Sequence, residues 1–227
     1  SLKLSTFTAF DFETTGLDPN SDRIIEIAAI RFEHGEIVDR FVSLVNPGID
    51  IPNLITEITG ISNSMVYKSP KETEIIDEFL SFLGDYPLVA HNIRFDEQFL
   101  SRLCIRYKKE ENNFKKYDTL QLARSLLFEQ PVFNLTALSD FYGLSSDNAH
   151  RAESDTENTG LIFLELIKEL AGYPLDFVSK VNTLIQGADI PNLHLFVDMA
   201  SALAKRGDLK KGLIDHGLIP NCKTNIF

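Results

Sequence analysis

Residues 8–16 read TAFDFETTG, a short apolar run that carries two acids one residue apart and ends in a glycine. In a β-strand, side chains alternate between the two faces, so Asp11 and Glu13 would point to one face while Phe10 and Phe12 point to the other. Two carboxylates then share one small space, which is unfavourable unless a cation lies between them or one of them takes up a proton. The stretch therefore indicates a metal site, an acid with a raised pKa, or an exposed strand end that carries acids.

Segments with strand-like and helix-like patterns follow one another along the rest of the chain. Runs rich in β-branched and apolar residues predict strands, and apolar stripes at helical spacing predict helices. Strands are expected over residues 8–16, 23–32, 37–45 and 87–92. Helices are expected over residues 54–60, 69–84, 95–103, 117–127, 134–142 and 152–170. Three opening strands followed by alternating helices and strands predict an α/β or α+β sandwich with a mixed sheet.

A Gly/Pro break at Ala171-Gly172-Tyr173-Pro174 divides the chain into two expected parts, a domain over residues 1–172 and a helical extension over residues 173–227. Three short helices are predicted in the extension, over residues 175–185, 193–203 and 209–214. About 55 residues make a marginal independent domain, so the extension is expected to pack on the first domain or to belong to a longer following one. Ser1 in place of Met and the abrupt end at Phe227 favour a fragment of a longer protein.

The composition is that of a globular protein with an acidic surface. The chain has 227 residues, of which 44% are hydrophobic, and a formal net charge of −11. Residues 172–227 hold 6 Lys/Arg and 5 Asp/Glu, so the acidity lies in the first part of the chain. This charge argues against a generally basic nucleic-acid-binding surface, although an acidic chain can act on nucleic acid where its contact surface is locally basic and metal ions neutralise the site.

The sequence indicates neither a membrane nor an oxidising compartment. The apolar runs are strand-sized, well short of the ~20 residues that a membrane span requires, and the N-terminus carries no signal-peptide pattern. Cys104 and Cys222 give neither a disulfide framework nor a zinc-binding spacing, so both are expected to be reduced. We therefore expect a cytoplasmic protein with no membrane partner.

Basic residues gather towards and beyond the end of the helix that begins at residue 95. They are Arg102, Arg106, Lys108, Lys109, Lys115 and Lys116. A solvated helix end, where cations complement the carbonyl end of the helix, is favoured over a patch that steers phosphates.

Polar residues gather at three places where strands end or helices begin, which is where sheets of this class place their sites. The three clusters are residues 11–13, 91–96 and 150–155. Taken singly, each has a structural explanation: Asp96 and Asp155 suit the first turn of a helix, and His91 suits a backbone hydrogen bond at the end of a buried strand. Taken together, four carboxylates with a histidine close by form the ligand set of a two-cation site.

The three clusters carry the motifs Asp11-x-Glu13-Thr14-Thr15-Gly16, His91-Asn92-x-x-Phe95-Asp96 and His150-x-x-x-x-Asp155. In order, spacing and flanking residues they resemble the DnaQ-like, DEDDh-type 3′→5′ exonucleases, the superfamily that includes the proofreading epsilon subunits of bacterial replicative polymerases. The resemblance covers about residues 5–171. It implies an α/β, RNase H-like fold, in which a five-stranded mixed sheet with an antiparallel second strand is flanked by helices. The C-terminal helical extension would follow this fold.

The resemblance also implies a set of catalytic residues. The family's metal ligands correspond to Asp11, Glu13, Asp96 and Asp155, and its general base corresponds to His150. An all-carboxylate site suits two Mg²⁺ or Mn²⁺ ions, hard cations that prefer oxygen and that can flank a scissile phosphate when ~4 Å apart. A histidine with an ordinary pKa near ~6.5 can take the proton of the attacking water at neutral pH. The implied product is a nucleoside 5′-monophosphate.

Softer matches imply the substrate contacts. Thr59 lies in a segment that resembles the one packing on the terminal nucleotide, and it stands where the epsilon subunits often have a histidine. Asn92 belongs to the second motif, and its neighbour Phe95 is expected to be a packing residue rather than a platform for base stacking. The family segment that meets the terminal 3′-hydroxyl corresponds to Thr14, Thr15 and Gly16.

Three functions are consistent with these residues. The first is a metal-dependent 3′→5′ exonuclease that acts on DNA with a single-stranded or frayed 3′ end, because the site takes one unpaired terminus. The second is an RNA 3′→5′ exonuclease of the same superfamily, and the third is a non-catalytic nucleic-acid-binding module. Exonucleases of this type occur alone, as polymerase subunits and fused to polymerases or helicases. A polymerase or helicase is therefore an implied partner, in the same chain or as a separate subunit.

Overall fold

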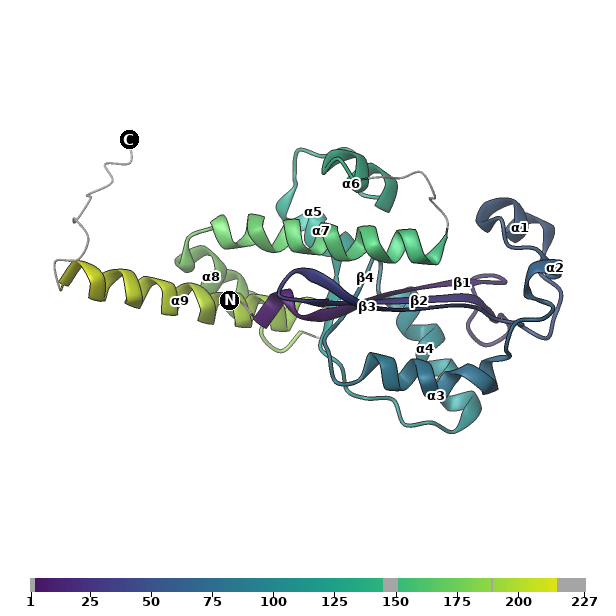
Figure 1. Ribbon diagram of the computed structural model, residues 1–227. Coiled ribbons are helices and arrows are strands. Elements are labelled where there is room, and N and C mark those ends of the chain that lie inside the picture. Colours follow the sequence, from purple (N-terminus) through teal and green to yellow (C-terminus); the bar gives the residue numbers. More distant parts are fainter. Residues whose placement is uncertain (1–2, 145–150, 189, 216–227) are drawn as a thin grey trace.

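A five-stranded mixed sheet forms the middle layer of the protein, with helices on both of its faces (Figure 1). The computed structural model describes residues 3–144, 151–188 and 190–215. The strands lie in the order β3-β2-β1-β4-β5, with β2 antiparallel to both of its neighbours and β1, β4 and β5 parallel to one another. Their bounds are β1 (Phe7–Thr14), β2 (Ile24–Glu33), β3 (Glu36–Leu44), β4 (Leu88–Ala90) and β5 (Lys116–Asp118). The expected RNase H-like sheet, with its antiparallel second strand, is confirmed.

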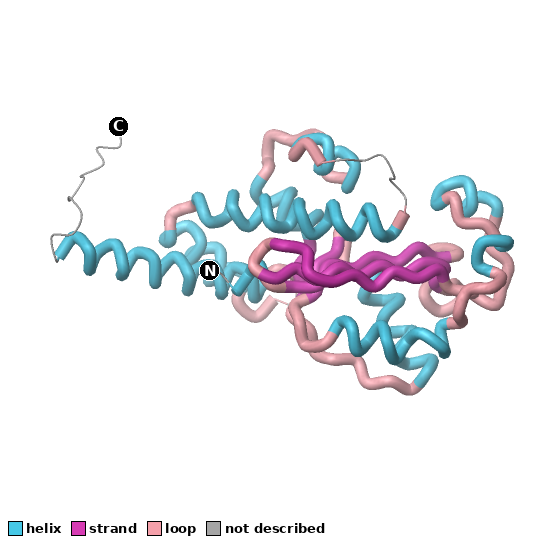
Figure 2. Tube along the Cα trace, viewed as in Figure 1, coloured by secondary structure: helices cyan, strands magenta, loops and turns pink. Residues whose placement is uncertain are grey.

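Helices form a layer on each side of the sheet. Figure 2 shows the strands as a single band between these two layers. α3 and α4 cover one face of the sheet, and α5 and α7 cover the other. Preceding β1 is the short 3₁₀ helix η1 (Lys3–Ser5). The α-helices are α1 (Asn53–Thr59), α2 (Asn63–Val66), α3 (Glu72–Leu83), α4 (Arg94–Tyr107), α5 (Thr119–Leu126), α6 (Leu135–Phe141), α7 (Ala152–Gly172), α8 (Leu175–Ile185) and α9 (Leu193–Asp215).

Strand β1 divides its side chains between the two cores. Phe7 packs edge-on against Phe163 of α7, with their ring centroids 4.9 Å apart, whereas Phe12 joins the core beneath α3 and α4. Because side chains alternate along a strand, Asp11 and Glu13 lie on the same side as Phe7 and therefore face α7. The fold thus directs both acids towards the helix that begins with the third sequence motif.

The segment over residues 117–127, predicted to be one helix, begins as a strand. Residues up to Asp118 complete β5, and α5 begins only at Thr119. The reason is local, because the Asp118 side chain accepts hydrogen bonds from the backbone N–H groups of Leu120 and Gln121 and so caps the helix at its first turn.

The extension also differs from its prediction. The two helices expected over residues 193–203 and 209–214 form one helix, α9, that runs through Gly207. A glycine in a helix interior costs only about 1 kcal/mol relative to alanine, so it does not end a helix by itself. In the described part of the chain, every helix is too short or too polar to cross a membrane.

Candidate active site

The two acids of β1 lie close to carboxylates from other elements. Burial, together with the negative charges of Asp155 and Glu26, raises the pKa of Asp11 to about 7. Burial and the charge of Asp11 raise the pKa of Glu13 to about 9. Asp155 and Glu26 add to this rise in the pKa of Glu13, and Arg151 opposes it. Because both acids of β1 interact with Asp155, the first turn of α7 lies beside the end of β1.

Asp96 reaches the same place from α4. It lies in the first turn of that helix and is only 1% exposed. Its Oδ1 accepts a hydrogen bond from the backbone N–H of Phe12, with an N···O distance of 3.1 Å. Phe12 lies between Asp11 and Glu13, so this bond fastens Asp96 to the strand that carries the other two acids. Burial and the charge of Asp11 hold the pKa of Asp96 well above its ordinary value.

An ion pair between a buried glutamate, Glu26, and an exposed arginine, Arg151, holds the start of α7 against β2. Glu26 is 1% exposed and lies opposite Glu13 in the ladder between β1 and β2. Its carboxylate accepts hydrogen bonds from Arg151 Nη2 at 2.6 Å and Nε at 3.2 Å, and from the backbone N–H of Ala152 at 3.0 Å. This bidentate pairing fixes the turn from which Asp155 projects.

Sequence reasoning missed both partners of this ion pair. Which residue of β2 lies opposite Glu13 depends on the strand register, and no pattern within one strand gives that register. The available signal was a single acid, Glu26, inside the otherwise apolar run Ile24-Ile25-Glu26-Ile27. An acid within a buried strand needs a partner, and Arg151 supplies it.

The structure brings four of the five predicted catalytic residues into electrostatic contact, namely Asp11, Glu13, Asp96 and Asp155. His150 lies outside the described residues. Carboxylates that raise one another's pKa are the groups whose charge a divalent cation would neutralise, so this donor set fits a hard divalent cation that prefers oxygen ligands. Among the described residues, no three Asp, Glu, His or Cys side chains already form a cluster able to hold a metal ion.

The turn after β1 is built around Asp22. The hydroxyl of Thr15 donates to Asp22 Oδ1 at 3.0 Å, and that of Thr14 donates to the backbone carbonyl of Gly16 at 2.6 Å. A Cβ atom on Gly16 would lie 2.5 Å from Asp22 Oδ2, so only glycine fits there without displacing the carboxylate. The predicted substrate segment over residues 14–16 is therefore a fixed turn beside the acids. Leu17, the next residue, is 82% exposed.

The other two predicted substrate residues have structural partners. The Thr59 side chain is buried at the end of α1, where its hydroxyl donates to the carbonyl of Ile55 at 2.9 Å and accepts from the N–H of Ile61 at 3.1 Å. Asn92 lies in the turn between β4 and α4 with a positive φ of 68°, and its backbone N–H donates to Asp118 Oδ1 at 3.2 Å. The hydroxyl of Thr59 is thus engaged within the helix end, whereas the side chain of Asn92 is exposed.

Two further residues of the second motif are structural, as predicted. His91 Nδ1 lies 2.9 Å from the hydroxyl of Thr119, and burial lowers the pKa of His91 to about 4 despite a hydrogen bond with the backbone of Phe133. Phe95 packs on Phe99 of α4, with their ring centroids 5.0 Å apart. Neither side chain is arranged as a ligand or a stacking platform.

Four of the basic residues at and beyond the end of α4 are paired with acids. Arg106 contacts the buried Glu72 at 2.7 Å, and Lys116 contacts Glu97. The other two pairs are Lys109–Asp77 and Lys115–Asp198, at 2.5 and 2.8 Å. These pairings support the structural interpretation of the basic cluster over a patch that steers phosphates.

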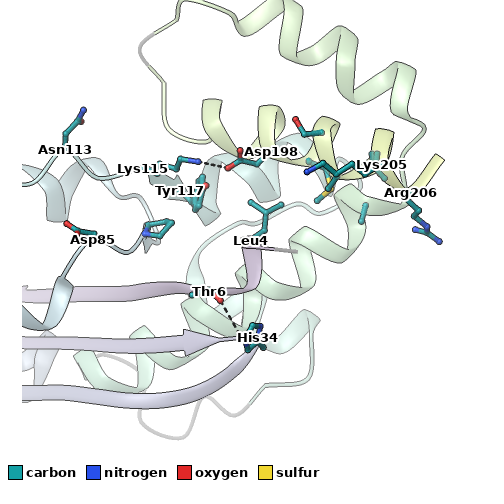
Figure 3. A pocket seen from close by; sticks show the side chains of 16 residues that line it. Leu4, Thr6, His34, Asp85, Asn113, Lys115, Tyr117, Asp198, Lys205 and Arg206 are labelled. Atoms are coloured by element: carbon teal, nitrogen blue, oxygen red, sulfur yellow. Dashed lines mark hydrogen bonds and ion pairs between the residues drawn. The ribbon is translucent and has the colours of Figure 1, made fainter. Parts of the chain in front are cut away.

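A groove of about 1040 Å³ lies at the opposite end of the strands from the acids (Figure 3). It is lined by residues that precede β1, β4 and β5 and by α9, and the Lys115–Asp198 ion pair crosses it. None of the predicted site residues lines it. The groove therefore belongs to the packing between α9 and the sheet rather than to the candidate site.

Several known proteins are similar to this chain in sequence or in fold. The sequence profile of the exonuclease family RNase_T matches residues 8–163. Over 165 residues the chain is 34% identical to DNA polymerase III subunit epsilon of Aquifex aeolicus, a match that covers 73% of this chain and 82% of that protein. A solved structure of exonuclease X in complex with 5′ overhanging duplex DNA is similar with a TM-score of 0.58 and 26% identity, covering 74% of this chain and 93% of that one.

Longer proteins contain a similar region. Over 199 residues the chain is 35% identical to the PolC-type DNA polymerase III of Caldanaerobacter subterraneus subsp. tengcongensis. This match covers 88% of the chain but only 14% of the polymerase. The chain thus spans a small part of the length of that relative.

Proposed function

The chain belongs to the family of DnaQ-like, DEDDh-type 3′→5′ exonucleases, and from this membership we propose that it hydrolyses DNA from the 3′ end and releases nucleoside 5′-monophosphates. The observation that supports this proposal most is the mutual interaction of Asp11, Glu13, Asp96 and Asp155 where β1, α4 and α7 meet. Structural acids at helix starts would not need to lie close enough to raise one another's pKa.

We propose Asp11, Glu13, Asp96 and Asp155 as the metal ligands. Two bound Mg²⁺ or Mn²⁺ ions would supply activation of the attacking water and stabilisation of the departing 3′ oxygen. The chain itself supplies placement of the carboxylates: the Phe12 N–H holds Asp96, and the Glu26–Arg151 ion pair holds the turn that precedes Asp155.

His150 is the proposed general base, which takes the proton of the attacking water as the phosphodiester bond breaks. In the sequence it directly precedes Arg151. The rigid turn over residues 14–16 is the proposed contact for the terminal 3′-hydroxyl, with Thr59 and Asn92 as further substrate contacts.

The relatives favour DNA over RNA and point to a larger assembly. The similar proteins are named as DNA polymerase III subunits or polymerases, and the structure of exonuclease X is a DNA complex. We propose that the chain works in the cytoplasm, beside a polymerase or helicase, as part of the same chain or as a separate subunit.

The test is incubation with Mg²⁺ or Mn²⁺ and matched DNA and RNA oligonucleotides with free 3′ ends, followed by gel analysis. Stepwise shortening of DNA is the expected result, whereas shortening of RNA alone would assign the RNA exonuclease function. Tight binding without cleavage in either metal would favour a non-catalytic binding module.

Variants then test the residue assignments. Asp11→Ala should abolish turnover and leave the fold intact. Asp39 is an exposed acid on β3, so the control variant Asp39→Ala should leave turnover unchanged. His150→Ala should reduce turnover by ~10²-fold or more, the usual contribution of a positioned general base. Full activity of Asp11→Ala would overturn the two-metal assignment.

A further inference from the structure

One residue of the C-terminal extension, Asn192 in the link between α8 and α9, hydrogen-bonds to the edge strand of the sheet. Its backbone N–H donates to the carbonyl of Lys116 at 3.1 Å. Its side-chain amide makes two more bonds to Asp118, accepting from the N–H at 2.9 Å and donating to the carbonyl at 3.0 Å. Lys116 and Asp118 belong to β5, the edge strand of the sheet, so Asn192 occupies the place of a neighbouring strand.

This contact is buried and specific for asparagine. Asn192 is 4% exposed and has a positive φ of 70°, a conformation that asparagine tolerates better than most residues. Its amide supplies one donor and one acceptor at the spacing that the N–H and C=O of Asp118 require. A side chain that lacks either the donor or the acceptor would leave one of these buried backbone groups without its partner.

The residue that Asn192 holds is itself bound to the second sequence motif. Asp118 is 1% exposed, and its Oδ1 accepts from the N–H of Asn92 as well as from the first N–H groups of α5. Asn92 has the positive φ of the turn that leads into α4. Asp96 follows in the first turn of α4 and accepts the N–H of Phe12. Hydrogen bonds from Asn192 to Asp118 and from Asp118 to Asn92, followed by the main chain over residues 92–96, therefore connect the extension to a predicted metal ligand.

We propose that Asn192 is a positioning residue for the exonuclease site. By holding the main chain of Asp118, it fixes the Asn92 turn and with it the placement of Asp96. This inference rests on the proposed function and assigns to the extension a role at the site. Residues in the outer shell of a metal site orient its ligands in the same way, and their loss typically weakens metal binding by ~10-fold or more.

The test compares two variants of the full chain. Asn192→Gly removes the amide but retains the backbone N–H and tolerates the positive φ. Val178→Ala, the control, removes buried methyl groups from α8 of the same extension. For each protein we would measure thermal unfolding, amide hydrogen exchange over residues 88–100 without metal, and Mn²⁺ binding by electron paramagnetic resonance.

Asn192→Gly is expected to speed exchange over residues 88–100 and to weaken Mn²⁺ binding by ~10-fold, with DNA cleavage recovering as Mn²⁺ is raised. Val178→Ala should lower the melting temperature and change neither measurement. If Asn192→Gly lowers the melting temperature but keeps wild-type exchange and wild-type Mn²⁺ binding, Asn192 is merely structural and the inference is wrong.

Two further outcomes are decided by the same design. If the wild-type chain neither binds Mn²⁺ nor cleaves DNA, the proposed function fails, and the exchange measurement still decides whether Asn192 controls the Asn92 turn. If Asn192→Gly does not fold, Asn192→Asp replaces it. This variant keeps the acceptor for the N–H of Asp118 but sets an oxygen against its carbonyl, and the same changes are expected.

Discussion

At the scale of single residues, the Glu26–Arg151 ion pair is expected to contribute both to the stability of the fold and to the placement of Asp155 in the candidate site. Arg151→Ala leaves the buried Glu26 without its two guanidinium bonds, so the free energy of unfolding is expected to fall by roughly 2 kcal/mol. Turnover should fall about tenfold, because the turn before Asp155 loses its anchor. Chemical denaturation and steady-state cleavage of a DNA oligonucleotide measure the two effects.

A matched control is another ion pair between an arginine and acids of α7. Arg40 of β3 pairs with Glu153 at 3.5 Å and with Glu157 at 2.7 Å, and all three side chains are over a third exposed. Exposed pairs contribute about 0–1 kcal/mol, so Arg40→Ala should change stability and turnover little. Equal effects of the two substitutions would contradict the anchoring role of Arg151.

His91 predicts a dependence of stability on pH. Burial is the main reason that its pKa is lowered to about 4, and the charge of Arg124 contributes. The unfolded chain, in which histidine has a pKa near ~6.5, then binds the proton more readily than the folded chain. Stability that is present above about pH 6.5 is therefore lost as the pH falls towards 4.

The variant His91→Asn tests this dependence, because an amide can still bond to Thr119 but does not titrate. Its melting temperature should fall less than that of the wild-type chain between pH 7 and pH 4.5. If the melting temperatures of both proteins fall equally across this pH range, a group other than His91 causes the acid sensitivity.

The site residues that the sequence could predict are those whose role is local. Alternation along one strand predicted that Asp11 and Glu13 share a face, and a position at the start of a helix made Asp96 a candidate site residue. The resemblance to the exonuclease family then implied their roles as metal ligands. Glu26 and Arg151 could not be predicted, since their pairing depends on the register of β2 against β1 and on the approach of α7 from 125 residues away. The only sequence signal for this long-range pair is weak: one acid, Glu26, inside an apolar run.

At the scale of elements, α7 lies very close to the sheet at Gly160. A Cβ atom there would lie 2.3 Å from Cε2 and 2.4 Å from Cζ of Phe32 in β2. Gly160→Ala should therefore push α7 away from the sheet and lower the free energy of unfolding by roughly 2 kcal/mol, as overpacking of a core does. Because α7 carries Asp155, Mn²⁺ binding and turnover should weaken as well.

The control for this substitution is the last residue of the same helix. Gly172 has no atom within 4 Å of an added Cβ, so Gly172→Ala should be neutral or stabilising by up to about 1 kcal/mol. Denaturation curves of the two variants give the comparison. A stable, fully active Gly160→Ala variant would mean that the close approach of α7 is not required.

Element boundaries were harder to predict than elements. The strand β5 has three residues, too few for a period, and pairing with β4 rather than intrinsic preference makes it a strand. At Gly207 the error was a predicted helix end that the structure does not have, because this glycine, a residue typical of helix ends, lies within α9. The outcome at β5 was set by structure outside the segment, whereas the cost of one glycine was too small to end α9.

At the scale of the whole molecule, the extension shares a core with the rest of the fold. Four of its side chains, Val178, Leu195, Phe196 and Met199, are buried in the same cluster as Phe7 of β1 and Phe163 of α7. The sequence break at Gly172 marks the end of a helix, and the hydrophobic core continues across it. We therefore propose that residues 1–172 form the exonuclease domain and that the described residues of the extension between Val178 and Met199 complete its core.

A chain that ends at Gly172 tests this proposal. Each fully buried apolar side chain contributes about 1.5–3 kcal/mol, so losing four removes several kcal/mol from a total that is typically 5–15 kcal/mol. We expect the melting temperature to fall by roughly 10 °C or more, or the chain to aggregate. A chain that ends at Gly207 is the matched control, since it keeps all four buried side chains and Asn192, and it should melt near the wild-type temperature. If the shorter chain instead keeps wild-type melting and DNA cleavage, the extension is a separate unit, and the buried contacts between it and the sheet contribute little to either.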